Sequence, residues 1–206
     1  GTGKCVLAFT SDGATSQGDF HEALKVAAVW SLPVIFVVER NYWGLSTPEH
    51  QQFIFDSFEQ KGPAYGMKTM SFNANDLIEA TEQFAAAAEY ARGEGKPILL
   101  EANTFRLRGH EEASGTKYYP EGMIEEMEKK EPMALLRAHP EGWGVTEGWI
   151  DEELARAKKQ VDEAFHAALD IPDVEYDSVE SLEDVFASSS SLSTASGGSR
   201  EMRFID

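Results

Sequence analysis

The stretch from Lys4 to Pro48, KCVLAFTSDGATSQGDFHEALKVAAVWSLPVIFVVERNYWGLSTP, decides the fold. It contains two apolar runs, Cys5–Phe9 and Val34–Val38, separated by a segment whose apolar residues recur every three or four positions. Short apolar runs are typical of buried strands, and the spacing between them is typical of an amphipathic helix. We therefore predict a strand, a helix and a second strand, and two strands joined by a crossover helix lie parallel.

Two oxygen-bearing side chains follow these predicted strands. Asp12 comes after the first run and Asn41 after the second, with 27 residues between Gly13 and Asn41. Because the carboxyl ends of parallel strands meet at one edge of a sheet, we expect Asp12 and Asn41 side by side at a ligand site. Carboxylate and amide oxygens suit Mg²⁺ that carries a phosphate, and Gly13 would let a backbone N–H approach it. The alternative is that Asp12 only caps the helix that follows it.

The remainder of the first half repeats the same pattern of strands and helices. A third strand is expected at Lys68–Phe72, a long Ala-rich helix from Leu77 to Ala91, and a fourth strand at Pro97–Thr104. Further helices are expected over residues 123–130, 132–138 and 152–169. The predicted fold class is α/β, a doubly wound parallel sheet that is incomplete, followed by a helical C-terminal region.

The composition changes along the chain suggest four segments. Residues 1–120 form the α/β domain, 121–187 a helical extension with an acidic tail that is extended from Ile171 to Ala187, 188–199 a Ser/Gly linker, and 200–206 the start of a following segment. A Ser/Gly linker normally joins two folded parts. We therefore expect the chain to be a piece of a longer polypeptide.

Charge and cysteine content limit the class of function. Thirty-six acidic against 18 basic side chains give a formal net charge of −18, which argues against binding nucleic acid or an anionic membrane. A single cysteine, Cys5, cannot form an intramolecular disulfide, so we expect a reducing compartment and a cytoplasmic location. The sequence contains no apolar run long enough for a membrane span.

Several short motifs resemble one enzyme family. Asp-Gly followed by Asn41 resembles the thiamin-diphosphate motif, usually Gly-Asp-Gly and then Asn-Asn some 25 to 30 residues later. More narrowly, the sequence resembles the alpha subunit of the E1 component of 2-oxo acid dehydrogenase complexes, the branched-chain type slightly more than the pyruvate type. The resemblance extends to about Phe186 and is carried by DGATSQGDFHEAL, LPVIFVVE, GLSTP, KGPAYG and PILLEANTFRLRGH. It implies a sheet of the thiamin-diphosphate-binding type.

The resemblance assigns a role to individual residues. It implies that Asp12, Asn41 and the backbone carbonyl of Trp43 bind Mg²⁺. It also implies that the backbone of Gly13 and Ala14 approaches the diphosphate. His110 matches a catalytic histidine that contacts the diphosphate and acts as a hydrogen-bond donor near the reacting centre. Without the resemblance, a surface loop histidine would be the default interpretation of His110.

Two residues depart from the family motif. Ser11 replaces its first glycine and Arg40 replaces its first asparagine, and neither lost residue supplies a metal oxygen. Two further cations, Arg106 and Arg108, either neutralise a phosphate or form surface salt bridges.

The resemblance implies oxidative decarboxylation of a 2-oxo acid with acyl transfer to a lipoyl group on E2. The implied cofactors are thiamin diphosphate and Mg²⁺, and the implied partners are an E1 beta subunit or fused beta domain, lipoyl-E2 and the 2-oxo acid, in a hetero- or homo-oligomer. Since the family places the glutamate that activates the cofactor on the beta subunit, we expect this chain alone to be inactive. The alternative, motivated by Ser11 and Arg40, is a cofactor-free binding or assembly module that retains the fold.

Overall fold

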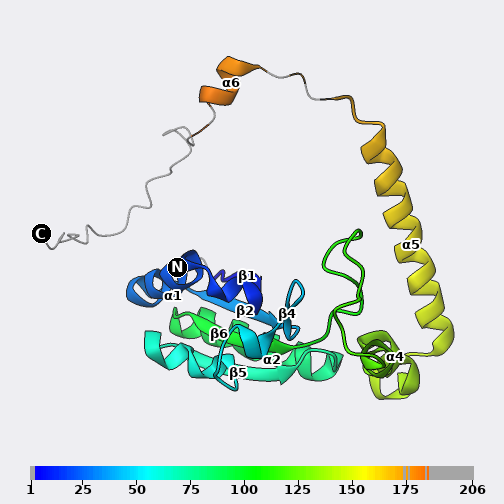
Figure 1. Cartoon of the computed structure of the whole chain (residues 1–206), viewed down its shortest axis with the longest axis horizontal. Coiled ribbons are helices and arrows are strands. Elements are labelled where there is room, and N and C mark those ends of the chain that lie inside the picture. The colour runs from blue at the N-terminus through cyan, green and yellow to red at the C-terminus, as the bar shows by residue number, and fades with distance from the viewer. Residues whose placement is uncertain (1–2, 174, 176, 184, 186–206) are drawn as a thin grey trace, which may run out of the picture. The chain divides into compact units, whose positions relative to one another are not determined.

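The computed structural model describes residues 3–173, 175, 177–183 and 185 (Figure 1). The chain divides into two compact units, Gly1–Glu153 and Leu154–Asp206. The strands are β1 (Val6–Ser11), β2 (Val34–Arg40), β3 (Trp43–Gly44), β4 (Thr47–Pro48), β5 (Lys68–Asn73) and β6 (Ile98–Asn103). The α-helices are α1 (Gly18–Trp30), α2 (Leu77–Glu94), α3 (Met123–Glu128), α4 (Pro132–Ala138), α5 (Glu147–Leu169) and α6 (Ser178–Glu183). No helix in these described ranges is long and apolar enough to cross a membrane.

The centre of the first unit is a four-stranded sheet in the order β1-β2-β6-β5 (Figure 1). All three strand pairs are parallel, with Val6 opposite Val34, and both Ile35 and Lys68 opposite Ile98. The chain therefore makes two strand–helix–strand units, β1-α1-β2 and β5-α2-β6, which lie side by side. The predicted α/β fold with a parallel sheet is confirmed.

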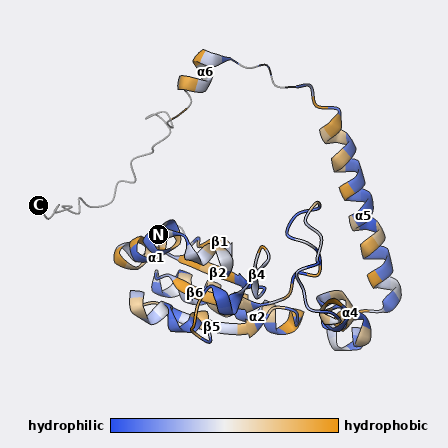
Figure 2. Cartoon of the chain, viewed as in Figure 1, coloured by the Kyte–Doolittle hydropathy of each residue, from blue (hydrophilic) through white to orange (hydrophobic). Residues whose placement is uncertain are grey.

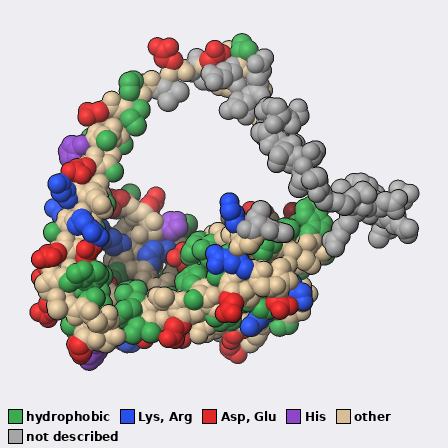
Figure 3. Space-filling view, turned by 180° about the vertical axis from the view of Figure 1, so that it is seen from behind, with side chains coloured by type: hydrophobic (Ala, Val, Ile, Leu, Met, Phe, Trp, Pro, Cys, Tyr) green, Lys and Arg blue, Asp and Glu red, His purple; other side chains and the backbone are tan. Residues whose placement is uncertain are grey.

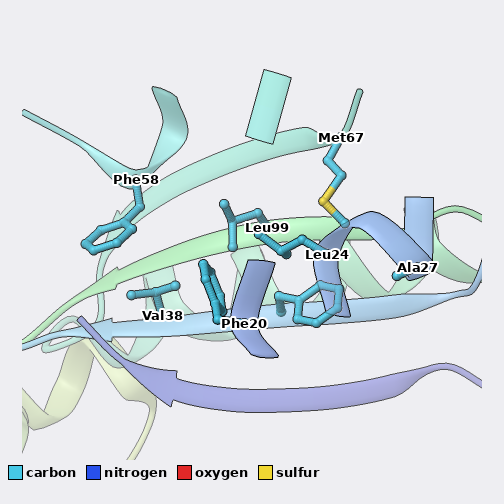
Figure 4. Packing of buried hydrophobic residues seen from close by; sticks show 8 residues of the cluster. Phe20, Leu24, Ala27, Val38, Phe58, Met67 and Leu99 are labelled. Carbon is cyan, nitrogen blue, oxygen red and sulfur yellow. The ribbon is translucent and has the colours of Figure 1, made fainter. Parts of the chain in front are cut away.

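Each face of the sheet carries its own hydrophobic core, because successive strand residues point to opposite faces. Phe36, Val38 and Leu99 pack on one face against α1 residues. Figure 4 shows Val38 and Leu99 together with Phe58 and Met67. Ile35, Val37, Ile98, Leu100 and Ala102 pack on the other face with Ala87 and Ala91 of α2. Burial on both faces explains why β2 and β6 read as continuous apolar runs in the sequence.

Strand β1 forms one edge of the sheet and is less covered than its neighbours. The side chains of Val6, Leu7 and Phe9 are 59%, 49% and 58% exposed, whereas Val37 and Val38 of β2 are fully buried. An apolar run in the sequence thus predicts a strand, but it does not predict how much of that strand is buried by neighbouring elements.

The first unit also contains the short helices that follow the sheet. Helix α4 begins where predicted, because the Glu131 carboxylate accepts hydrogen bonds from the N–H groups of Met133 and Ala134. Helix α5 begins at Glu147, five positions before the predicted start at Glu152. Thr146 caps it by accepting the N–H of Trp149 at 3.2 Å, and the buried Ile150 anchors its first turn.

The second unit contains most of α5 and the short helix α6. Within α5, exposed apolar residues, among them Val161 and Phe165, alternate with charged ones, as Figure 2 shows. Residues 171–187 were expected to be extended, but Ser178–Glu183 is helical because Asp177 accepts the N–H of Val179 at 2.8 Å. The predicted linker, 188–199, and the segment 200–206 lie outside the described residues.

The formal net charge of the chain is −18. On the face seen in Figure 3, acidic side chains are spread among hydrophobic and basic ones. An anionic ligand would therefore depend on local donors.

Candidate functional site

Asp12 follows β1 at the carboxyl edge of the sheet and is fully buried. Its backbone N–H donates to the carbonyl of Glu39 in β2 at 3.3 Å, and its Oδ1 accepts the N–H of Gly13 at 2.8 Å. The other carboxylate oxygen, Oδ2, is buried without a hydrogen-bond partner among the described residues. Asp12 therefore caps the short turn that follows it and still keeps one oxygen free.

The environment of Asp12 disfavours its ionised form. Burial raises the pKa of the carboxyl above its usual value, and the N–H groups of Gly13 and Tyr42 act in the opposite direction. The influence of Tyr42 also indicates that the carboxylate lies beside the loop that leaves β2. A divalent cation bound to Oδ2 would relieve the cost of this buried charge, because it would add positive charge to that of Arg40 nearby.

Asn41 and Trp43 lie in that second loop, directly after β2. Both are largely buried, at 9% exposure, and Oδ1 of Asn41 accepts the N–H of Trp43 at 3.2 Å. The indole of Trp43 packs edge-on against Tyr119, with ring centres 5.1 Å apart. Tyr42, between them, takes a left-handed backbone conformation with φ of 68°. Since a carbonyl oxygen has two lone pairs, Asn41 can bind a cation while it holds this turn.

A cavity of about 370 Å³ opens at this edge of the sheet. Four of the predicted site residues, Gly13, Ala14, Trp43 and His110, are among its lining residues. Asp12 and Asn41 are not among them. Both are buried in the two loops that supply part of the lining, which is a position suited to a cation beneath a larger ligand.

The two loops touch through their backbones at Gly13 and Gly44. A Cβ atom on Gly13 would lie 2.8 Å from Cα of Gly44, closer than real Cβ contacts. A Cβ atom on Gly44 would instead meet the side chain of Gln52 at 2.6 Å. Glycine at position 13 is therefore required by a close approach of backbone to backbone.

Arg106 and His110 reach the cavity from the loop that follows β6. The guanidinium Nη1 of Arg106 lies 3.2 Å from Nδ1 of His110, and Nη2 donates to the carbonyl of Leu45 at 2.8 Å. From the sequence, Arg106 and Arg108 either neutralise a phosphate or form surface salt bridges. The structure separates them, because Arg106 lines the cavity whereas Arg108 is exposed and is not a lining residue.

A buried ion cluster around Arg40 is the feature that sequence reasoning missed. Arg40 donates through Nε and Nη2 to both carboxylate oxygens of Glu49, at 2.9 and 2.7 Å, and through Nη1 to Glu101 at 2.7 Å. Glu101, only 2% exposed, also accepts Ser57 Oγ at 2.6 Å and the N–H of Phe58. The hydrogen bond with Glu49 raises the pKa of Arg40 further above its usual value, against the effect of burial.

The cluster gives a structural reason for one departure from the family motif. Arg40 ties Glu49 and the carbonyl of Asp56 to the end of β2, and so fixes both ends of the loop that carries Asn41 and Trp43. The signal available in the sequence was a basic residue at the end of a buried strand, with acidic residues in later segments. Its partners could not be chosen without the fold.

The donor set at this edge fits Mg²⁺ better than a transition metal. The described part of the chain holds no group of three or more His, Cys, Asp or Glu side chains that could bind a metal. It offers instead one carboxylate whose Oδ2 has no partner in the described residues and one buried amide oxygen, those of Asp12 and Asn41. Mg²⁺ binds few protein oxygens and completes its octahedron with phosphate and water, so this set is compatible with it.

Comparisons with known proteins place the chain in a family. Residues 1–176 match the sequence model of the family described as "Dehydrogenase E1 component". Over 172 residues the chain is 37% identical to 2-oxoisovalerate dehydrogenase subunit alpha 2, mitochondrial, of Arabidopsis thaliana, covering 80% of this chain and 35% of that protein. It is 35% identical to 3-methyl-2-oxobutanoate dehydrogenase subunit alpha of Mycobacterium tuberculosis, covering 84% and 48%. It is 32% identical to pyruvate dehydrogenase E1 component subunit alpha of Rickettsia bellii, covering 66% and 42%.

Among solved structures, transketolase from Leishmania mexicana matches with a TM-score of 0.43 and 22% identity, over 48% of this chain and 15% of that one. Transketolase from Campylobacter jejuni matches with the same TM-score and identity, over 62% and 21%. The chain spans between about a third and a half of the length of the relatives named above. On the match of residues 1–176, the chain belongs to the dehydrogenase E1 component family.

Proposed function

We propose that this chain is the alpha-type part of a 2-oxo acid dehydrogenase E1 component and supplies the Mg²⁺ and diphosphate half of a thiamin-diphosphate site. The observation that carries the proposal is the buried Oδ2 of Asp12, which has no partner among the residues that the structure describes and lies beside a cavity lined by Gly13, Ala14 and His110. Family membership and the names of the relatives support the reaction class.

Each site residue has one role in this proposal. Asp12 Oδ2, Asn41 Oδ1 and the carbonyl of Trp43 hold the cation. The backbone of Gly13 and Ala14 lies against the diphosphate, and the imidazole of His110 donates to it. When bound, thiamin diphosphate would supply the electron sink for loss of CO₂ from the 2-oxo acid, while the protein positions and orients.

The proposed partners follow from the family. An E1 beta subunit, or a fused beta domain, completes the site, and a lipoyl group on E2 accepts the acyl group. The substrate is a 2-oxo acid of the branched-chain or pyruvate class, as in the names of the relatives. This chain alone is expected to show no decarboxylation with thiamin diphosphate and Mg²⁺, and measurable CO₂ release from the purified chain would contradict that expectation.

Titration calorimetry of the E1 assembly that contains this chain tests the site. Thiamin diphosphate should bind with a heat that requires Mg²⁺. Loss of a residue that only supports a metal ligand typically lowers affinity about 10- to 100-fold. Asp12→Asn changes a proposed ligand itself, so it should weaken the binding of thiamin diphosphate by more than that. Unchanged affinity in this variant would refute the ligand assignment, and absence of Mg²⁺-dependent heat in the unmodified assembly would favour a cofactor-free module.

Asp76→Asn is the matched control. Asp76 caps α2 with its carboxylate and accepts the N–H groups of Ile78 and Glu79, so it resembles Asp12 as a cap. Asparagine is an equally good cap, and Asp76 does not line the cavity of the site. The assembly that carries Asp76→Asn should bind thiamin diphosphate with the same affinity as the unmodified assembly.

A further inference from the structure

Arg106 connects three groups around the candidate cavity. Its Nη1 lies 3.2 Å from His110 Nδ1, and its Nη2 donates to the carbonyl of Leu45 at 2.8 Å and to Tyr118 Oη at 3.0 Å. The hydroxyl of Tyr119 donates back to the carbonyl of Arg106 at 2.9 Å. The side chain thus joins the loop after β6 to the loop after β2.

The contact with His110 determines where the imidazole carries its proton. A guanidinium has five N–H donors, no acceptor, and stays protonated in proteins. Nδ1 of His110 must therefore accept, and the proton of the neutral ring is on Nε2. In the other tautomer, or in the imidazolium, Nδ1 carries a proton. Two hydrogen-bond donors, Nδ1–H and the guanidinium N–H of Arg106, would then face each other.

The remaining ring nitrogen is then the one available to a ligand. His110 lines the cavity together with Gly13 and Ala14, and its Nδ1 is occupied by Arg106. An Nε2–H group is a hydrogen-bond donor and fits a phosphate oxygen, whereas an unprotonated Nε2 would repel one. Nε of Arg106 is buried without a partner in the described part of the chain.

We propose that Arg106 is a positioning residue that holds His110 as the Nε2–H tautomer, so that the imidazole donates to a diphosphate oxygen in the cavity. The ligand in this proposal rests on the proposed function. The tautomer itself depends only on contacts within this chain. The two can therefore fail separately.

Long-range ¹H–¹⁵N NMR of the labelled chain tests the tautomer, since the two ring nitrogens give distinct signals when protonated and unprotonated. The chain has five histidines, and the signals of His110 are identified by their loss in His110→Gln. At neutral to slightly alkaline pH, His110 should show a protonated Nε2 and an unprotonated Nδ1. A protonated Nδ1 in the unmodified chain would overturn the proposal without any variant.

Variants separate positioning from general structural support. Arg106→Met should shift His110 to a mixture of tautomers, and Arg106→Lys should restore at least part of the Nε2–H form because an ammonium also only donates. Arg108→Met, an exposed arginine two positions away, should leave the spectrum unchanged. An unaltered His110 signal in a folded Arg106→Met chain, judged by its backbone amide spectrum, would refute the role of Arg106.

Binding of thiamin diphosphate to the assembly gives the second readout. Arg106→Met should weaken it by about 10- to 100-fold, as expected for a group that orients a direct donor. Full affinity in this variant would show that the tautomer does not matter for the ligand and would overturn that half of the proposal. If the unmodified assembly binds no thiamin diphosphate, the proposed function fails, and the proposal that His110 donates to this ligand fails with it.

Discussion

Two buried ionisable groups lie at the carboxyl edge of neighbouring strands, and their surroundings differ. Arg40, at the end of β2, donates to Glu49, to Glu101 and to a backbone carbonyl. Asp12, just after β1, uses one oxygen for Gly13 and leaves the other without a partner in the described residues. Removing one partner from the complete cluster would leave an uncompensated buried charge, whereas the carboxylate of Asp12 already has an oxygen that lacks a partner in the described residues.

The largest expected effect comes from breaking the complete cluster. Arg40→Met would leave Glu101, 2% exposed, without its cation, and should lower the free energy of unfolding by about 3–5 kcal/mol. Urea unfolding of the chain, followed by near-ultraviolet circular dichroism, measures this change.

An exposed ion pair provides the control for that measurement. Arg137 and Asp151 lie 2.7 Å apart, but their side chains are 41% and 66% exposed. Arg137→Met should change the free energy of unfolding by no more than about 1 kcal/mol. If Arg40→Met were equally mild, the cluster would not hold the loop that carries Asn41 and Trp43.

The next effect concerns the backbone beside Asp12. Gly13→Ala would place Cβ 2.8 Å from Cα of Gly44, and since both groups belong to the main chain, the loops must separate. We expect a loss of about 1–3 kcal/mol in the free energy of unfolding, with weaker Mg²⁺-dependent binding of thiamin diphosphate. Gly18→Ala is the control, because a Cβ there meets nothing within 4 Å. Equal stability of the two variants would show that the contact between the loops is not tight.

The smallest expected effect is a gain in stability, in contrast to the losses above, and it depends on pH. Burial raises the pKa of Asp12 in the folded chain above its usual value, so without a cation the folded state binds the proton more tightly than the unfolded state. The free energy of unfolding then falls as the pH rises from below that usual value through the raised pKa.

Asp12→Asn removes this loss. The metal-free variant should therefore gain stability relative to the unmodified chain as the pH rises from 4 to 7, by about 1 kcal/mol, the order of cost of a buried group without a partner. Urea midpoints of both chains across this range measure the difference. If the stability gained by Asp12→Asn over the unmodified chain decreased toward neutral pH, burial would not be the cause of the raised pKa.

Local patterns were sufficient to predict most of the first unit. Strands β1, β2 and β6 contain short apolar runs, and Asp76 marks the start of α2, whose predicted end at Ala91 lies three residues before the observed end at Glu94. The start of α5 was missed because a cap by Thr146 and the burial of Ile150 depend on neighbours that the sequence does not identify. The helix Ser178–Glu183 was missed for lack of a strong apolar period.

The candidate site was predictable only in part. The rule that parallel strands end at one edge located Asp12 and Asn41, and the family motifs indicated His110. The network of Arg40 joins residues 9 and 61 positions away, so its partners depend on the tertiary fold. Asp12 was considered either as a cap or as a ligand. The structure shows the cap, and it leaves Oδ2 without a partner among the described residues, so the ligand role stays a prediction.

The exposed strand β1 has a practical consequence for handling the protein. Its side chains Val6, Leu7 and Phe9 are about half exposed at the edge of a parallel sheet, and edges of this kind promote association between chains. Purified alone at high concentration, the chain should self-associate through this strand. A lysine at position 7 or 9 is therefore the first change to try for samples that must stay monodisperse.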